Sequence, residues 1–264
     1  MFKRNRLIIF AVSAAVVIAA ALFIQSRYVL PVIMYHSISP APVKGDLLAV
    51  SAGTFERQMR FLKEHRYNVI RVEDLNDYAG GRKKIPPRAV AVTFDDGFKD
   101  NYTNAFPVLR KYNIPATVFI IVSKVGEPDR LSWDQIREMQ ASGLITFGSH
   151  TLTHQLLCGI KSDADLEREI AGSKADMEEK LGRKVSLFCY PCGNFDDRVK
   201  EIVRESGYES AVAVNPGAWA RDNDIWAFKR LRISENARNM FVFRVEISGY
   251  YNFLRELRQG KHKS

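Results

Sequence analysis

The feature that most restricts the fold of this chain is a repeated alternation of short apolar runs with longer amphipathic segments. The apolar runs are rich in β-branched residues, as buried strands usually are. They lie at residues 31–36, 67–72, 89–94, 116–121, 144–149, 185–190, 209–214 and 228–233. Segments of helical periodicity lie between strands at residues 54–65, 101–112, 132–142, 162–182 and 197–206. This alternation predicts an α/β fold whose parallel strands are joined by right-handed crossovers.

Two architectures satisfy this alternation, a closed barrel and an open sheet with helices on both faces. The chain has 264 residues, of which 46% are hydrophobic, and this fits one large domain with a substantial core. Barrels of β/α units commonly exceed about 200 residues as one domain. We therefore expect a β/α barrel.

The N-terminal residues predict contact with a membrane. Residues 7–24 carry no charged side chain, and a helix of this length reaches roughly 27 Å, enough to cross a hydrocarbon core. Three basic residues precede this run, so the positive-inside rule keeps the N-terminus in the cytoplasm. We expect residues 1–29 to form a single-pass anchor in the cell membrane and residues 30–264 to form an extracytoplasmic body.

A cleaved signal peptide is the alternative to an anchor. The alanines at positions 19–21 offer an A-x-A-like cleavage site. Cleavage near residues 21–25 would release a secreted protein, so the body lies outside the cytoplasm in either case.

The charge of the chain argues against one class of partner. The net charge is +9, and four basic residues flank the apolar run, which leaves about +5 for the body. The other basic residues are scattered and are not interleaved with aromatic residues. We therefore expect no nucleic-acid partner.

Polar residues follow several of the predicted strands. In parallel barrels the chemistry sits at the carboxyl ends of the strands and in the loops that follow them. His36 closes the first strand, Asp95 and Asp96 close the third, His150 closes the fifth, and residues 190–193 close the sixth. We expect these side chains to meet on one face of the barrel.

Two short motifs carry the chemistry of this face. The stretch TFDDG places Asp95 and Asp96 side by side, so that one carboxylate can hold a metal while the other addresses a water molecule. The stretch SHTLTH places His150 and His154 four positions apart, where one helical turn would direct both rings to one ion. Either motif alone is also typical of a polar loop. Together, two imidazoles and a carboxylate form a three-ligand set suited to Zn²⁺ or a related ion.

With these motifs the chain resembles the polysaccharide deacetylases of carbohydrate esterase family 4, the NodB homology domain. The family motifs T-F-D-D-G and H-[ST]-x-x-H both stand unaltered here, and the resemblance covers roughly residues 30–245. It implies a distorted barrel of seven or eight β/α units. It also implies a metal-dependent hydrolase that removes N-acetyl groups from a polysaccharide.

The resemblance assigns roles to the motif residues. Asp95 would be the general base, and Asp96, His150 and His154 would bind the metal. The expected metal is Zn²⁺, with Ni²⁺, Co²⁺ and Fe²⁺ as alternatives. A water activated by the ion would attack the acetamide carbonyl while Asp95 takes its proton.

The third family motif departs from its usual form. It normally reads R-x-P-[YF]-G, and the matching stretch here is CYPCG, with Cys189 at the arginine position and Cys192 at the aromatic position. The backbone N–H of Cys192 is implied to line the oxyanion hole, with Tyr190, Pro191 and Gly193 beside the substrate. The arginine that orients the base in the family has no counterpart in this motif.

The three cysteines, Cys158, Cys189 and Cys192, do not predict a disulfide framework, because their number is odd. Cys189 and Cys192 form a Cys-x-x-Cys pair, which also occurs in redox proteins. Residues 193–196 separate this pair from the next predicted helix at 197–206, whereas a redox motif opens its helix directly. We expect inert thiols or one structural disulfide.

The proton donor must come from an unusual position. The family's late leucine-x-histidine motif is absent, since the only histidine after residue 154 is His262 in the basic tail. The first predicted strand ends in Tyr35-His36, as in the permuted poly-N-acetylglucosamine deacetylases of biofilm matrix. This resemblance implies that His36 is the general acid; the alternative is a histidine packed under a loop.

The sequence thus predicts a metal-dependent N-deacetylase of an N-acetylhexosamine polysaccharide, with poly-N-acetylglucosamine as the expected polymer. Two other functions remain open on the same fold. One is a non-catalytic glycan-binding protein, against which Asp95 argues because binding alone needs no base. The other is an amidase for a substrate that is not a sugar.

Overall fold

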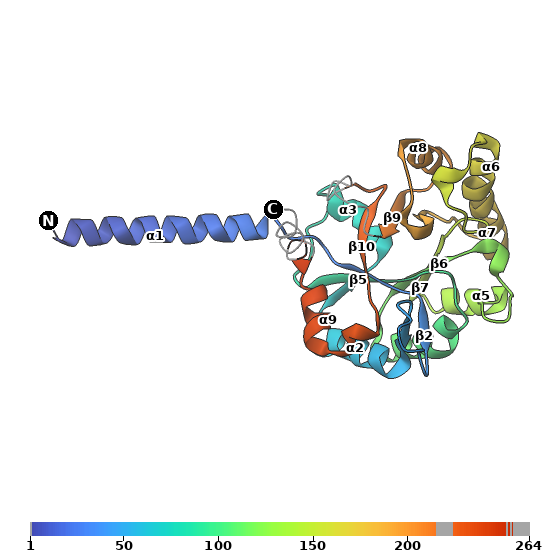
Figure 1. The fold of residues 1–264 in the computed structure, drawn as a ribbon, viewed down its shortest axis with the longest axis horizontal. Helices are drawn as coiled ribbons and strands as arrows, with labels where there is room; N and C mark the ends of the chain where they lie inside the picture. The colour runs from blue at the N-terminus through green and yellow to red at the C-terminus, as the bar shows by residue number, and fades with distance from the viewer. Residues whose placement is uncertain (1, 215–223, 252, 254, 256–264) are drawn as a thin grey trace.

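The computed structural model describes residues 2–251 except 215–223, together with residues 253 and 255. For residues 2–9, 11 and 12 only the backbone is described. The strands lie in the centre of the body and helices surround them (Figure 1).

All eight predicted strands are present, and neighbouring strands pair in parallel. They are β1 (Val32–Tyr35), β4 (Asn68–Ile70), β5 (Ala89–Phe94), β6 (Ala116–Ile120), β7 (Ile145–Ser149), β8 (Leu187–Cys189), β9 (Ser210–Val214) and β10 (Phe228–Arg232). Because β1 pairs with both β10 and β5, seven strands close into a ring. Strand β4 pairs with the first half of β5 as an eighth strand. The predicted α/β barrel is therefore confirmed.

The strands form because both of their faces are buried. In β5 all six residues are buried, as expected for a parallel strand covered on both sides. Alternate strand side chains join two separate cores. Val90 and Val92 belong to the core shared with the helices, whereas Ala91 lies with Phe119 and Val212 in the second core, on the opposite face of the strands.

The predicted helices are found with small changes. They are α2 (Ala52–Glu64), α4 (Phe106–Tyr112), α5 (Trp133–Ala141), α6 (Asp163–Glu167), α7 (Ser173–Leu181) and α8 (Asp197–Glu205). The segment predicted as one helix at 162–182 divides into α6 and α7, because a π-helical stretch, Arg168–Gly172, lies between them. Two short helices, α3 (Leu75–Ala79) and α9 (Met240–Glu246), and a small sheet of β2 (Ser37–Ser39) and β3 (Ala49–Ser51) were not predicted.

The N-terminal helix α1 (Phe2–Gln25) projects from the barrel as a single rod (Figure 1). Within the described part of the chain, no helix is long and apolar enough to cross a membrane. The predicted transmembrane segment at residues 7–24 falls partly on side chains outside the described ones, and the anchor is not confirmed. The division at residue 29 stays a prediction.

Candidate active site

The predicted site residues meet at the carboxyl end of the barrel. His36 follows β1, Asp95 and Asp96 follow β5, and His150 follows β7. The pairing of β1 with β5 places Tyr35 opposite Phe94, and the Asp95 N–H donates to the Tyr35 carbonyl at 2.9 Å. Ring closure therefore brings His36 beside the two carboxylates despite about 60 intervening positions along the chain.

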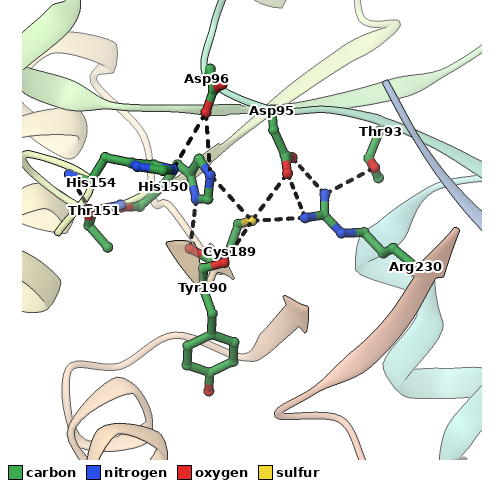
Figure 2. Close-up of polar contacts among 10 residues, drawn as sticks. Thr93, Asp95, Asp96, His150, Thr151, His154, Cys189, Tyr190 and Arg230 are labelled. Carbon is green, nitrogen blue, oxygen red and sulfur yellow. Dashed lines mark hydrogen bonds and ion pairs between the residues drawn. The ribbon is translucent and has the colours of Figure 1, made fainter. Parts of the chain in front are cut away.

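Asp96, His150 and His154 direct their ligand atoms toward one point (Figure 2). The Asp96 Oδ1 atom lies 3.5 Å from His150 Nε2 and 3.7 Å from His154 Nε2. All three ligand atoms lie within 4.8 Å of one another. The His150 side chain is 3% exposed and that of His154 is 29% exposed, so the site is open on the His154 side.

The protonation of His150 suits a metal ligand. Its Nδ1 atom lies 2.9 Å from the Cys189 carbonyl oxygen, so Nδ1–H donates to this carbonyl and leaves the Nε2 lone pair facing Asp96. Burial lowers the pKa of His150, which keeps the imidazole neutral. One carboxylate oxygen and two imidazole nitrogens, one of them oriented by the backbone, fit a divalent cation.

The histidine pair is held by a strained loop. The expectation that both rings share a helical turn is wrong, because residues 150–156 form no helix. Thr151 and His154 have φ angles of 66° and 68°, and Asp96 has a φ of 68°. Left-handed backbone at a residue other than glycine costs about 1–3 kcal/mol and persists where its surroundings impose it. The contacts around the loop therefore hold its backbone in a conformation that directs His150 and His154 toward Asp96.

Asp95 is held by an arginine that the sequence did not reveal. Arg230 on β10 donates from Nη1 to Asp95 Oδ1 at 2.6 Å and from Nη2 to Oδ2 at 2.7 Å (Figure 2). Neither side chain is more than 2% exposed. Such a two-pronged bond fixes the plane of the carboxylate. The orienting arginine that is missing from the third motif thus has a counterpart on another strand.

The charge of Arg230 sets the protonation of Asp95. Burial raises the pKa of this carboxyl, but the nearby guanidinium and its hydrogen bonds outweigh burial and lower the pKa to about 2. His150 and His36 act in the same direction. Asp95 is therefore an ionised acceptor throughout the neutral range.

Sequence reasoning missed Arg230 because the stretch FKRLRI contains three basic residues, Lys229, Arg230 and Arg232. Of these, Arg230 is 2% exposed and belongs to the buried residues. Its place in the middle of a strand was a weak sign that its side chain is buried, because strand side chains alternate and only every second one points inward. Which one turns inward depends on how β10 joins β1 and β9.

Arg230 also blocks a second set of residues that could hold a metal ion. Asp95, His150 and Cys189 also have ligand atoms within 4.8 Å of one another. However, Arg230 bonds both oxygens of Asp95, and its Nη2 lies 3.0 Å from Cys189 Sγ. Burial raises the pKa of the Cys189 thiol well above its usual value, so the thiol stays protonated. A cation would meet a guanidinium there, which leaves the Asp96 set as the candidate metal site.

His36 lies at the end of β1, next to the end of β5 that carries both carboxylates. Burial lowers the pKa of His36, while the charges of Asp95 and Asp96 oppose this effect. Its Nδ1 atom is buried and has no hydrogen-bond partner in the described part of the chain. Its carbonyl oxygen accepts a hydrogen bond from Asn101 Nδ2 at 2.7 Å, which ties the strand end to the π-helical segment Asn101–Ala105.

The residues of the third motif build a turn beside the site. Cys192 is exposed and has a φ of 55°, which turns the backbone sharply after Pro191. A Cβ atom at position 193 would lie 2.6 Å from the Val214 carbonyl oxygen, so only glycine fits there. The Tyr190 side chain is fully buried, packs against Phe195 and points away from His150 (Figure 2). Tyr190 and Gly193 therefore shape the turn, and the Tyr190 side chain does not reach a substrate surface.

The cysteines are all free. Cys189 is buried, Cys158 is partly buried and Cys192 is exposed. The sequence allowed either free thiols or one structural disulfide, and the structure has free thiols at all three positions.

The fold and the site together define a parallel β/α barrel enzyme class with a guanidinium-held carboxylate beside an Asp–His–His set at its carboxyl end, where such barrels carry their active sites. A family model described as polysaccharide deacetylase matches residues 82–211. The Bacillus subtilis protein YxkH is 34% identical over 205 residues, covering 78% of this chain and 71% of that protein. This chain belongs to the polysaccharide deacetylase family and is a hydrolase of that family.

Other relatives agree with this assignment. The poly-β-1,6-N-acetyl-D-glucosamine N-deacetylase of Staphylococcus aureus is 29% identical over 201 residues, 72% of this chain and 69% of the relative. A polysaccharide deacetylase structure from Bacillus cereus superimposes with a TM-score of 0.72 at 34% identity, covering 82% of this chain and 68% of that one. The structure of IcaB from Ammonifex degensii gives a TM-score of 0.72 at 29% identity, with coverages of 84% and 97%.

Proposed function

We propose that this protein removes N-acetyl groups from a poly-N-acetylglucosamine polysaccharide in a reaction that depends on a divalent metal. The observation that carries the proposal is the convergence of Asp96, His150 and His154 beside the carboxylate held by Arg230. The Staphylococcus aureus relative is named as an N-deacetylase of the β-1,6-linked polymer, which supports the choice of substrate.

The metal would be bound by Asp96 Oδ1, His150 Nε2 and His154 Nε2. Zn²⁺ suits a set of two imidazoles and one carboxylate, and Ni²⁺, Co²⁺ and Fe²⁺ are the alternatives. When bound, the ion supplies a Lewis acid for the acetamide carbonyl and for water. The partly exposed His154 lies on the side from which a polymer would reach the ion.

The chain's own residues would carry the proton transfers. Asp95, ionised and held in one orientation by Arg230, would accept the proton of the attacking water. The Cys192 N–H, which follows β8 in the sharp turn, would donate to the developing oxyanion. His36, at the end of the strand that pairs with β5, would donate a proton to the departing amine.

Acetate release from defined oligosaccharides tests this proposal. The full chain, loaded with Zn²⁺, should release acetate from β-1,6-linked N-acetylglucosamine oligomers faster than from β-1,4-linked oligomers or peptidoglycan. The Asp95→Asn protein is the matched control, because it keeps the ligand set. Binding of the oligomers without acetate release would instead show a glycan-binding protein, and hydrolysis confined to amides that are not sugars would show an amidase.

We also propose that residues 1–29 bring the body to the outside of the cytoplasm, either as an anchor or as a cleaved signal peptide. The uncharged run at 7–24 and the basic residues before it support this proposal. A surface polysaccharide as substrate would require the same location. A periplasmic or extracellular reporter fused after residue 264 should be active, and an active cytoplasmic reporter at that position would contradict the proposal.

A further inference from the structure

A buried carboxylate lies behind the loop that carries His154. Glu169 is 4% exposed and comes from the π-helical stretch Arg168–Gly172 between α6 and α7. Every hydrogen bond found for its carboxylate in the described part of the chain goes to the loop that contains the two histidines. Burial of a carboxylate is costly unless its oxygens are hydrogen-bonded, so these bonds account for its position.

The bonds from Glu169 converge on Thr153, the residue before His154. The Thr153 N–H donates to Glu169 Oε2 at 2.9 Å, and the Thr153 hydroxyl donates to Oε1 at 2.5 Å. Gln155 Nε2 donates to Oε1 at 3.3 Å, and the Leu152 N–H donates to the Glu169 carbonyl oxygen at 3.1 Å. One glutamate thus binds residues 152, 153 and 155 of the loop.

These bonds hold a backbone that would otherwise relax. Thr153 stands between Thr151 and His154, whose left-handed φ angles are disfavoured for residues other than glycine. The carboxylate fixes the segment between the two strained residues. Its loss would allow the backbone to return to more populated angles, and this would move the His154 ring away from Asp96.

The two histidines differ in how much they need such support. His150 follows β7 directly, its N–H bonds the Ile120 carbonyl, and its ring bonds the Cys189 carbonyl. For the His154 ring, the described residues provide no hydrogen bond; its N–H bonds Thr151 Oγ1 within the loop. The position of His154 therefore depends on the loop, and the loop depends on Glu169.

We propose that Glu169 is a positioning residue for the metal ligand His154, so that its carboxylate sets the affinity of the site for a divalent cation. The inference rests on the metal site within the proposed function but does not depend on the substrate. Outer partners of metal ligands typically contribute about 10–100-fold to affinity.

The test measures Zn²⁺ affinity of the full chain by competition with a chromophoric chelator. Glu169→Ala should weaken Zn²⁺ binding about 10–100-fold. Glu169→Gln should weaken it less than Glu169→Ala, because its amide oxygen still accepts from one Thr153 donor, although its NH₂ group faces the other. Thr153→Val removes the hydroxyl bond alone and should have the smallest effect. Asp165→Asn is the matched control, because this exposed carboxylate pairs only with Arg168 among the described residues and should leave the affinity within about twofold.

A second measurement separates positioning from general stabilisation. In the His154→Ala background, Glu169→Ala should change Zn²⁺ affinity by no more than about twofold, because the ligand that it positions is absent. An equal loss in both backgrounds would overturn the proposal. So would a folded Glu169→Ala protein with wild-type affinity, even if its metal-free form melts at a lower temperature.

If Glu169→Ala does not fold, wild-type affinity in both Glu169→Gln and Thr153→Val overturns the proposal. Because no arm uses acetate release, failure of the deacetylase assay would leave this result intact.

Discussion

The two halves of the site are built in opposite ways. On one side, Asp95 is buried, lies at the end of a strand and is bonded through both oxygens by Arg230 from another strand. On the other side, Asp96 and His154 lie in loops with left-handed backbone, and the His154 side chain is 29% exposed. The first half has its own internal cation, whereas the second directs three donor atoms at one point. The charge of the first half is thus balanced within the protein, whereas the donor atoms of the second half would be balanced by the proposed metal ion.

The adjacent carboxylates owe this division of labour to the backbone. Asp95 continues the direction of β5 and joins the ladder to β1 through its N–H. The next residue, Asp96, has a φ of 68°, which turns its carboxylate toward the two histidines. Two consecutive carboxylates therefore reach different partners, Arg230 for Asp95 and the two histidines for Asp96.

Loss of a metal ligand should have the largest effect. His150→Ala removes the ligand that is most firmly held, so we expect no stoichiometric Zn²⁺ after dialysis and no detectable acetate release. Elemental analysis and the acetate assay measure both quantities. Full metal occupancy in the doubly substituted His150→Ala, His154→Ala protein would show that the metal binds elsewhere.

Asp95→Asn should separate the two halves. The substitution removes the proton acceptor but none of the three ligands, so Zn²⁺ content should stay at the wild-type value. The kcat should fall by about 10²–10⁴-fold, as for the loss of a general base. Near-normal turnover in this variant would make Asp95 a structural residue.

His36→Ala should affect turnover without affecting the metal. If His36 protonates the departing amine, kcat falls by about 10²-fold while Zn²⁺ affinity is unchanged. Steady-state kinetics on a folded variant provide the check. Wild-type turnover would leave His36 as a residue packed at the strand end, which is the alternative reading of its position.

Arg230→Lys should shift the pH dependence. In the wild type, Arg230 overcomes burial and lowers the pKa of Asp95 to about 2, so the carboxylate stays ionised as the pH falls. Lysine offers no matched pair of donors, so the pKa of Asp95 should rise and the acidic limb of the pH–rate profile should move to higher pH. We expect kcat to fall by about tenfold or more as the carboxylate loses its fixed plane. An unchanged acidic limb would contradict the role given to Arg230.

The cysteines should show the smallest effect. Cys192 is exposed and Cys189 is buried with a raised pKa, so iodoacetamide should label Cys192 and spare Cys189 in the folded protein. Cys192→Ser keeps the backbone N–H and should retain kcat within about threefold. A much larger loss would mean that the side chain, and not the backbone, acts at this position.

The sequence predicted the residues whose signal is local. All eight strands follow from apolar runs, and Asp95, Asp96, His150 and His154 stand in two short motifs at strand ends. Arg230 and Glu169 were not predicted, because their partners are not neighbours in sequence. Arg230 bonds Asp95 from another strand, and Glu169 accepts hydrogen bonds from Thr153 in the histidine loop. Their roles depend on how the barrel closes and how the π-helical stretch packs, and neither property has a periodic signature in the chain.

The small elements escaped prediction for a related reason. Strands β2 and β3 have three residues each, too few for alternation to show, and they pair with one another across a loop. The histidine loop was expected to be helical because spacing of four residues suits a helix equally well. Instead, the Thr151 and Thr153 N–H groups donate to Ser149 Oγ and to the Glu169 carboxylate, and these bonds hold the left-handed turns of the loop.

Anomalous diffraction from crystals of the full chain soaked with Zn²⁺ would test the contrast between the two halves most directly. We expect one ion at about 2.0–2.2 Å from Asp96 Oδ1, His150 Nε2 and His154 Nε2. The bonds between Arg230 and Asp95 should remain unbroken in the same crystal. An ion bound by Asp95, His150 and Cys189, with Arg230 displaced, would contradict the assignment of the two halves.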